Sequence, residues 1–185
     1  MADTTDFRNG YTIRIDGEIL SIVEFQHVKP GKGGAFTRTR LKNVMSGAVI
    51  DRTFRSGDKV EEIRIEKREM QFLYSEGDTF HFMDAETYDQ IAVDLALVGD
   101  SANLLRENAT ADVLMVEERA IGIELPNFVE IAVTFTEPGV KGDTATGAVK
   151  PATLETGTVV SVPLFVNQGD ILKIDTRTGA YVERV

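Results

Sequence analysis

YTIRIDGEILSIVEF, at residues 11–25, alternates apolar and polar side chains on both sides of an Asp-Gly pair. Ile13 and Ile15 would share one face of an extended chain, because successive side chains of a strand point to opposite faces. Asp16-Gly17 is a preferred pair for a two-residue hairpin turn. This stretch therefore predicts two antiparallel strands. The same alternation recurs along most of the chain, so the predicted fold class is all-β.

Short strands separated by Gly, Asp and Asn turns fall into three segments. The alternation lapses in a charged run around residues 59–64, and Pro126-Asn127 interrupts the chain a second time. We predict three small domains, at residues 1–64, 65–126 and 127–185. One short helix is expected in the second domain, because Asp100 could cap the helix formers that continue to Arg106. The short strands of the third domain are typical of an OB-type barrel.

The composition narrows the class of protein. The 185 residues include no cysteine, which excludes disulfides, thiolate zinc sites and cysteine nucleophiles. The first residues lack the basic and apolar regions of a secretory signal, and no apolar run reaches the roughly 18 residues of a membrane helix. We therefore expect a cytoplasmic protein with no membrane partner.

The net charge of −10 is unevenly distributed. Residues 1–64 carry 11 Lys and Arg against 9 Asp and Glu, whereas residues 65–126 carry 4 against 14. From Lys29 to Arg55 the only acid is Asp51, and the cations are Lys29, Lys32, Arg38, Arg40, Lys42, Arg52 and Arg55. Such a cluster is typical of RNA-binding surfaces, but a solvated face of a small barrel explains it equally well.

A lysine lies between glycines in the segment Lys29-Pro30-Gly31-Lys32-Gly33-Gly34. Glycines allow positive φ and remove side-chain bulk, so the backbone could approach another surface closely while Lys32 reaches further. In the strand predicted next, Arg38, Arg40 and Lys42 would project from one face. The spacing of a phosphate-binding Gly-Lys loop is absent, which argues against a nucleotide site. Taken alone, this segment would be interpreted as a flexible turn with an incidental lysine.

A second segment changes that interpretation. Residues 150–169, KPATLETGTVVSVPLFVNQG, resemble the signature of bacterial elongation factor P, K-x-A-x4-G-x2-[LV]-x-V-P-x2-[LIV]-x2-G, at every defined position. The Lys-Pro-Gly-Lys-Gly loop also occurs at that family's position, and the C-terminal residues from Tyr181 to Arg184 agree. The resemblance covers essentially the whole chain.

The resemblance implies an L-shaped monomer of three β-barrels, the first SH3-like (KOW-type) and the second and third OB-like. Such a protein mimics the shape of tRNA and binds the ribosome between the P and E sites. There it stimulates peptide bond formation on ribosomes stalled at consecutive prolines. The partners would be rRNA, P-site peptidyl-tRNA and E-site mRNA, and we expect no cofactor.

The resemblance also implies roles for individual residues. Lys32 would lie along the acceptor end of P-site tRNA, and in that family its amine is often extended by a modifying enzyme. The residue after Gly33 varies within the family and is Gly34 here, so β-lysylation, an aminopentanol extension or no modification all stay open. A lysine at position 32 argues against the rhamnosylated branch. Other expected contacts are to tRNA or rRNA (Arg38, Arg40, Lys42, Arg52, Arg55, Tyr181, Arg184) and to mRNA (Gly142, Asp143, Thr144).

The residues that could support catalysis form no catalytic motif. His27 and His81 are in no motif with a nucleophile or with metal-ligand spacing, and neighbouring acids such as Glu61-Glu62 would point to opposite faces of a strand. We therefore expect no enzyme activity, no catalytic residue and no metal site. The alternative is a general single-stranded RNA-binding protein of OB and SH3-like barrels, which would stack bases on exposed aromatic rings. Most phenylalanines occupy strand positions whose side chains would point to the buried face, which favours a role in the core.

Overall fold

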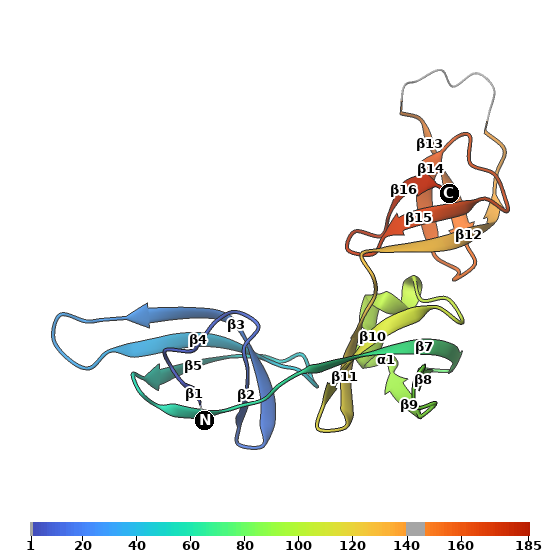
Figure 1. The fold of residues 1–185 in the computed structure, drawn as a ribbon. Helices are drawn as coiled ribbons and strands as arrows, with labels where there is room; N and C mark the ends of the chain where they lie inside the picture. Colours follow the sequence, from blue (N-terminus) through green and yellow to red (C-terminus); the bar gives the residue numbers. More distant parts are fainter. Residues whose placement is uncertain (1, 140–146) are drawn as a thin grey trace. The chain divides into compact units, whose positions relative to one another are not determined.

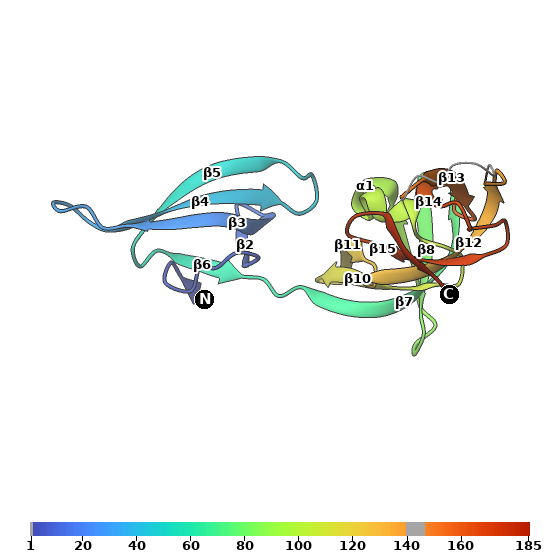
Figure 2. The same cartoon turned by 90° about the horizontal axis from the view of Figure 1, so that it is seen from above.

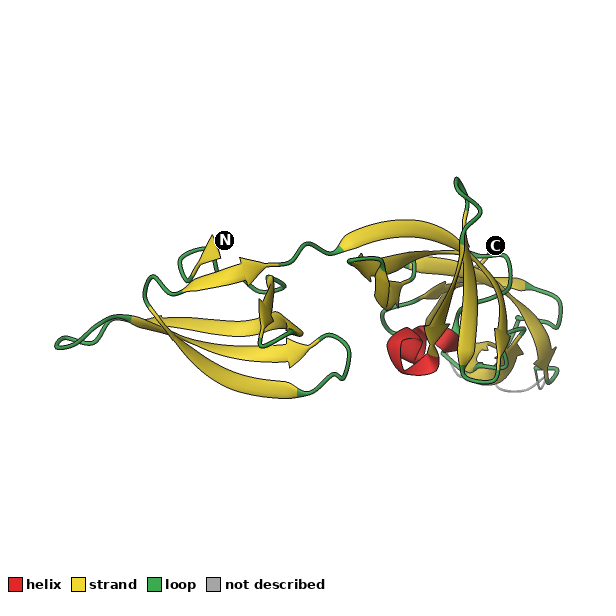
Figure 3. Cartoon of the chain, turned by 90° about the horizontal axis from the view of Figure 1, so that it is seen from below, coloured by secondary structure: helices red, strands yellow, loops and turns green. Residues whose placement is uncertain are grey.

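The computed structural model describes residues 2–139 and 147–185. These residues cluster into two compact units: unit 1 comprises Met1–Glu66 with Leu114–Ile121, and unit 2 comprises Lys67–Val113 with Gly122–Val185. Strands dominate both units, which confirms the predicted all-β class (Figures 1 and 3). No helix in the described residues has the length and apolar character needed to cross a membrane. The domain boundaries expected after residues 64 and 126 stay predictions.

The sheet of unit 1 is curled and has the strand order β1-β6-β2-β3-β4-β5. Asp16 and Gly17 have φ angles of 53° and 84°, and Ile15 pairs with Glu18 across them. Positive φ at both central residues is characteristic of a type I′ turn, so the predicted hairpin is confirmed. The strand bounds are β1 (Ala2–Asp3), β2 (Thr12–Ile15), β3 (Glu18–Val28), β4 (Phe36–Asn43), β5 (Val49–Arg55) and β6 (Lys59–Glu62).

The core of unit 1 follows from the alternation along these strands. Ile13 pairs with Leu20, and Ile22 pairs with Leu41, so their side chains meet on the inner face of the sheet. Each side chain of this size stabilises the fold by about 1.5–3 kcal/mol when fully buried. The buried core cluster consists of Ala2, Phe7, Tyr11, Ile13, Leu20, Ile22, Leu41, Phe54 and Val60. The opposite face of the same strands is left for polar and charged side chains.

The second sheet has the order β11-β10-β7-β8-β9. Its core includes Met70, Phe72, Phe82 and Val93, which are at most 3% exposed. The strand bounds are β7 (Glu66–Glu76), β8 (Thr79–Asp84), β9 (Gln90–Asp94), β10 (Thr110–Val116) and β11 (Arg119–Glu124).

The helix predicted in this segment exists but lies earlier in the chain. Helix α1 spans Leu95–Val98, and a 3-10 turn, η1, continues over Gly99–Asn103. The segment predicted from Asp100 to Arg106 therefore overlaps η1 over residues 100–103, but the α-helix lies earlier and the helical turns end before Leu104. Leu104 and Leu105 follow the turn and are 6% and 5% exposed, and Leu104 packs into the core of the third sheet. Intrinsic helix propensity is a weak determinant of structure, and it does not extend the helix through these leucines.

The third sheet has the order β14-β13-β12-β15-β16. Strands predicted near residues 128–135, 158–162 and 170–174 are all present. The strand bounds are β12 (Phe128–Thr136), β13 (Val149–Leu154), β14 (Val159–Pro163), β15 (Ile171–Asp175) and β16 (Ala180–Arg184).

The signature at residues 150–169 is explained by this barrel. Ala152, Val160, Val162 and Val166 are at most 6% exposed and belong to its core cluster. Gly157 and Gly169 have φ angles of 86° and 89°, which side-chain-bearing residues rarely adopt. Lys150 is 8% exposed, and its Nζ donates a 2.6 Å hydrogen bond to the backbone carbonyl of Glu137 just after β12. The signature therefore specifies packing and turn geometry within the barrel.

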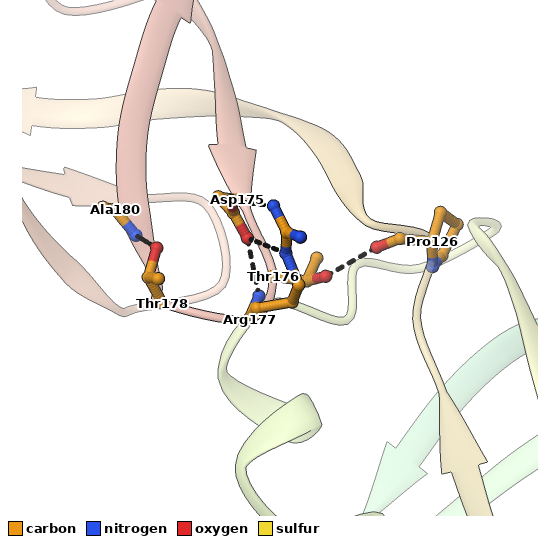
Figure 4. Close-up of polar contacts among 6 residues, drawn as sticks. All are labelled: Pro126, Asp175, Thr176, Arg177, Thr178 and Ala180. Atoms are coloured by element: carbon orange, nitrogen blue, oxygen red, sulfur yellow. Dashed lines mark hydrogen bonds and ion pairs between the residues drawn. The ribbon is translucent and has the colours of Figure 1, made fainter.

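The β15–β16 turn contacts the segment that precedes β12 (Figure 4). Thr176 Oγ1 donates a 2.6 Å hydrogen bond to the carbonyl of Pro126, and the Thr176 N–H donates to the carbonyl of Asn127 at 3.0 Å. Asp175 accepts hydrogen bonds from the Arg177 backbone N–H at 2.9 Å, from its Nε at 3.1 Å and from its Nη2 at 2.7 Å. The Arg177 side chain, followed by its backbone N–H, lowers the pKa of Asp175 from 3.8 to about 2.

We predict that Asp175→Asn lowers the stability of the protein at neutral pH. A carboxyl group with a depressed folded-state pKa stabilises the native state above its unfolded pKa, and this contribution is lost as the pH falls through the folded-state value. The difference in unfolding free energy between parent and variant should therefore be constant above about pH 5 and shrink toward pH 2. Urea denaturation of the full chain across this range measures it.

Asp94→Asn is the matched control, because Asp94 is exposed and makes no capping hydrogen bond to α1. A parent-minus-variant difference for Asp175→Asn that does not change between pH 6 and pH 2 would contradict the assignment.

Candidate functional site

The β3–β4 hairpin carries the lysine loop. The two strands pair from Leu20 and Asn43 to Val28 and Phe36, with one irregularity in register at Val23. Residues 29–35 continue beyond the last pair and form the end of the hairpin (Figures 1 and 2). Antiparallel pairing therefore holds this loop at a fixed distance along the strands from the core of unit 1.

The loop presents Lys32 between glycines, which have no side chains. All residues from Lys29 to Gly34 are exposed. Gly33 has a φ of 114°, a conformation that favours glycine, and a Cβ at Gly31 or Gly34 would meet no heavy atom within 4 Å. Among the described residues, Lys32 makes no hydrogen bond or ion pair. Its amine is thus available to a partner outside this chain.

Polar contacts hold both sides of the loop at its base. His27 and Thr37 lie opposite each other, with His27 Nδ1 2.8 Å from Thr37 Oγ1. Thr37 is 1% exposed, and the Ser56 N–H donates a 2.9 Å hydrogen bond to the carbonyl of Ala35. The ring of His27 also lies edge-on to Phe25, with centroids 5.4 Å apart. His27 therefore has structural contacts at the start of the loop.

The predicted cationic face of β4 is present. Arg38, Arg40 and Lys42 are exposed and alternate with buried Thr37, Thr39 and Leu41 along the strand. Arg55 lies opposite Phe36, on the same face as Arg38. Arg52 lies opposite Thr39, on the other face, where it contacts Asp16 at 3.4 Å. The structure thus brings together four of the five predicted cations of β4 and β5 on one surface, and separates Arg52 from them.

Two of these arginines differ in their surroundings. Arg40 lies between Glu24 and Asp51, with its Nη1 3.6 Å from Glu24 Oε2 and its Nε 3.3 Å from Asp51 Oδ1. Arg38 has no ion-pair partner within residues 2–139 and 147–185, and its guanidinium carbon lies 5.5 Å from the centroid of the Phe36 ring. Asp51 is visible in the sequence as the single acid among the cations, but Glu24 is not, because its place beside Arg40 depends on the register of β3 against β4. A prediction of that register would have identified Glu24.

The remaining predicted site residues belong to unit 2 or lie outside the described residues. Tyr181 is partly buried and packs against the core of the third barrel. Arg184 Nη1 is 3.3 Å from Asp170 Oδ2, and its guanidinium carbon lies 5.3 Å from the centroid of the Phe165 ring. The Asn167 backbone N–H, followed by the Arg184 side chain, lowers the pKa of Asp170. Gly142, Asp143 and Thr144 lie outside the described residues.

Sequence reasoning missed the exposed aromatic residues of the third barrel. Phe128, Phe135 and Phe165 are 43%, 58% and 56% exposed, whereas Phe72 and Phe82 are buried as expected. Lys173 Nζ and the guanidinium carbon of Arg177 lie 5.3 Å and 5.9 Å from the centroid of the Phe128 ring. Phe128 begins its strand, a position at which apolar side chains are less constrained to the core. Strand parity alone cannot identify such end positions.

Three segments of the chain match family models. The matches are a KOW-like domain at residues 3–60, an OB domain at residues 65–123 and a C-terminal domain at residues 129–184. All three models describe one class of protein, a translation elongation factor. They are the models of elongation factor P, and they match most of the sequence. The chain therefore belongs to the elongation factor P family.

Relatives with this name match over the full length. Elongation factor P of Pelotomaculum thermopropionicum is 57% identical over 185 residues, and that of Carboxydothermus hydrogenoformans is 55% identical, each match covering 100% of both chains. Among solved structures, eukaryotic translation initiation factor 5A from Methanococcus jannaschii aligns with a TM-score of 0.53 and 22% identity over 64% of this chain and 90% of the other. That likeness supports the shared fold and the barrel assignments.

We predict that Gly33→Ala distorts the lysine loop whereas Gly34→Ala does not. A side chain at a φ of 114° costs about 1–3 kcal/mol of backbone strain, which the loop can relieve by changing conformation. Gly34 is the matched control, because a Cβ there meets open space and its φ is not positive. NMR chemical shifts of residues 29–36 should change more in Gly33→Ala, and equal changes in both variants would contradict the prediction.

Proposed function

We propose that the protein binds the ribosome between the P and E sites and stimulates peptide bond formation at consecutive prolines by positioning peptidyl-tRNA through Lys32. One observation carries this proposal. Lys32 is exposed, has no partner in the described part of the chain and lies at the end of a paired hairpin, on a loop of minimal side-chain bulk. Membership of the elongation factor P family supplies the ribosomal context.

The proposed mechanism is orientation without a catalytic group. The proline ring fixes φ near about −65° and also restricts the preceding residue, so a nascent chain ending in prolines reaches a reactive pose slowly. A cation held along the CCA end of the tRNA would favour the reactive arrangement, and each 1.36 kcal/mol or so removed from the barrier is about tenfold in rate. His27 contacts Thr37 and His81 stacks on Tyr74 with centroids 4.5 Å apart, so both histidines have structural contacts. We therefore propose a factor that is not an enzyme.

The proposed partners follow from the same placement. The outer face of β4 and β5 would lie along tRNA and rRNA phosphates, with Tyr181 and Arg184 making further tRNA contacts. The residues Gly142, Asp143 and Thr144 would face E-site mRNA. We propose that the protein acts as a cytoplasmic monomer of three domains with boundaries near residues 64 and 126. Lys32 is the proposed site for a modifying enzyme where the amine is extended, and an unmodified Lys32 stays open.

A general single-stranded RNA-binding function is the second candidate. The exposed rings of Phe128, Phe135 and Phe165 favour it, because aromatic rings on OB barrels stack with unpaired bases. Two of these rings, however, already have a cationic side chain within 6 Å of their centroids. A base that stacked on either ring would have to compete with that cation for the ring face.

We predict that Lys32→Ala removes the stimulation of peptide bond formation at consecutive prolines. The rate on a reporter with three prolines should fall at least about tenfold relative to the parent, while the rate on a proline-free reporter stays the same. The measurement is single-turnover peptide formation in a reconstituted translation system. Lys59→Ala is the matched control, because Lys59 is an exposed lysine of unit 1 on β6, which pairs with β1 and β2 and with neither strand of the hairpin. Full stimulation by Lys32→Ala would refute the proposed role of Lys32.

We predict that the protein co-sediments with ribosomes carrying P-site tRNA and does not retain free oligonucleotides. The proposed site recognises an assembled crevice of RNA, and the acidic net charge opposes binding to isolated polyanions. Fluorescence anisotropy with a 20-nucleotide RNA at physiological salt tests the second part. Tight binding to that RNA without ribosomes would favour the general RNA-binding function instead.

A further inference from the structure

The outer face of the β3–β4–β5 sheet is organised in cross-strand rows. In one row Arg38 lies between Gln26 and Thr53, and in the next row Arg40 lies between Glu24 and Asp51. Residues directly opposite on neighbouring strands have Cβ atoms about 4.5–5.5 Å apart, so each row acts as a local group of charges. These rows line a shallow open groove over the sheet. Three arginines line this groove. Arg52 contacts Asp16 at 3.4 Å, whereas Arg38 and Arg40 stand in the two rows and differ in their electrostatic settings.

The row of Arg40 is net negative. Two carboxylates lie within 3.6 Å of its guanidinium, one on each side, so the row carries one positive and two negative charges. The Arg40 side chain is 54% exposed, and the carboxylates beside it are 72% and 77% exposed. A phosphate that approached Arg40 would meet both carboxylates at similar distances, and their repulsion would offset the attraction of the arginine.

The row of Arg38 is positive. Gln26 and Thr53 beside it are uncharged, and their amide and hydroxyl groups can donate hydrogen bonds to phosphate oxygens. Arg55 lies on the same face in the following row, opposite Phe36, and adds a second positive charge on the side nearest the lysine loop. An arginine without a carboxylate partner retains the planar set of donors that binds a phosphate with two parallel hydrogen bonds.

We propose that Arg38, with Gln26 and Thr53, is a subsite for one RNA backbone phosphate, and that Glu24 and Asp51 mask Arg40 from the same RNA. This inference rests on the proposed binding to ribosomal RNA or tRNA, and it deepens that function by assigning unequal roles to two neighbouring arginines. The masking limits the number of phosphates that the face can neutralise. It thereby keeps the affinity for RNA backbone in general low, so that binding depends on the shape of the ribosomal site.

The test measures ribosome affinity by co-sedimentation at several salt concentrations for the parent and three variants of the full chain. Each phosphate contact contributes about 0.7–0.9 to the slope of log affinity against log salt. Arg38→Gln should reduce the slope by about this amount and weaken binding. Arg40→Gln should reduce it by less than half as much. Asp51→Asn, which releases Arg40 on one side, should tighten binding and increase the slope.

The variants separate this inference from the function on which it rests. Equal losses in Arg38→Gln and Arg40→Gln, or no gain in Asp51→Asn, would overturn the inference while the parent still binds ribosomes. A parent that fails to co-sediment at any salt concentration would overturn the proposed function and this subsite with it. Circular dichroism and urea midpoints of the variants, expected to match the parent because all three positions are exposed, exclude misfolding as the cause.

Discussion

The antiparallel pairing of β3 with β4 is the constraint on which the candidate site depends. It extends from Leu20 and Asn43, beside the core, to Val28 and Phe36, at the base of the lysine loop. Because side chains alternate between faces, the same register that buries Leu41 on Ile22 also directs Arg38, Arg40 and Lys42 outward. A slip of one residue would exchange the two faces, placing cations in the core. The core of unit 1 therefore fixes both the position of Lys32 and the orientation of the cationic surface.

Charged side chains on this protein serve two distinct purposes. Arg177 and Arg184 each contact a carboxylate of their own barrel, and Arg40 contacts two. Exposed ion pairs such as those of Arg40 contribute little to stability, typically about 0–1 kcal/mol, so the main consequence of that pairing is that the cation is less available to a partner. Within residues 2–139 and 147–185, Lys32 and Arg38 are unpaired. Counting basic residues along the sequence cannot separate the two groups, because pairing is decided by cross-strand neighbours.

The residues that identify the family and the residue proposed to act on the ribosome are of different kinds. The signature at residues 150–169 is explained by burial of Val160, Val162 and Val166, by glycines at positive φ, and by the hydrogen bond from Lys150 to the Glu137 carbonyl. Its residues are constrained by packing within one barrel. Lys32 is exposed and makes no hydrogen bond or ion pair in the described part of the chain, so a partner outside the chain would have to constrain its amine. The family is therefore identified by residues that pack within one barrel, whereas the candidate site is identified by an exposed residue without a partner in the described part of the chain.

The local features of this protein follow from residues that are neighbours in the chain. Period-2 alternation with Asp16-Gly17 fixed the first hairpin, and the glycines around Lys32 predicted an exposed loop, because these patterns act through neighbouring residues. Other features depend on residues far apart in the chain and become visible only in the folded protein. The packing of Leu104 into the core of the third barrel is one such feature. The register that places Glu24 beside Arg40 is another, and it divides the arginines of β4 into paired Arg40 and unpaired Arg38 within residues 2–139 and 147–185. Packing and strand register are long-range properties, and a pattern within one segment does not contain them.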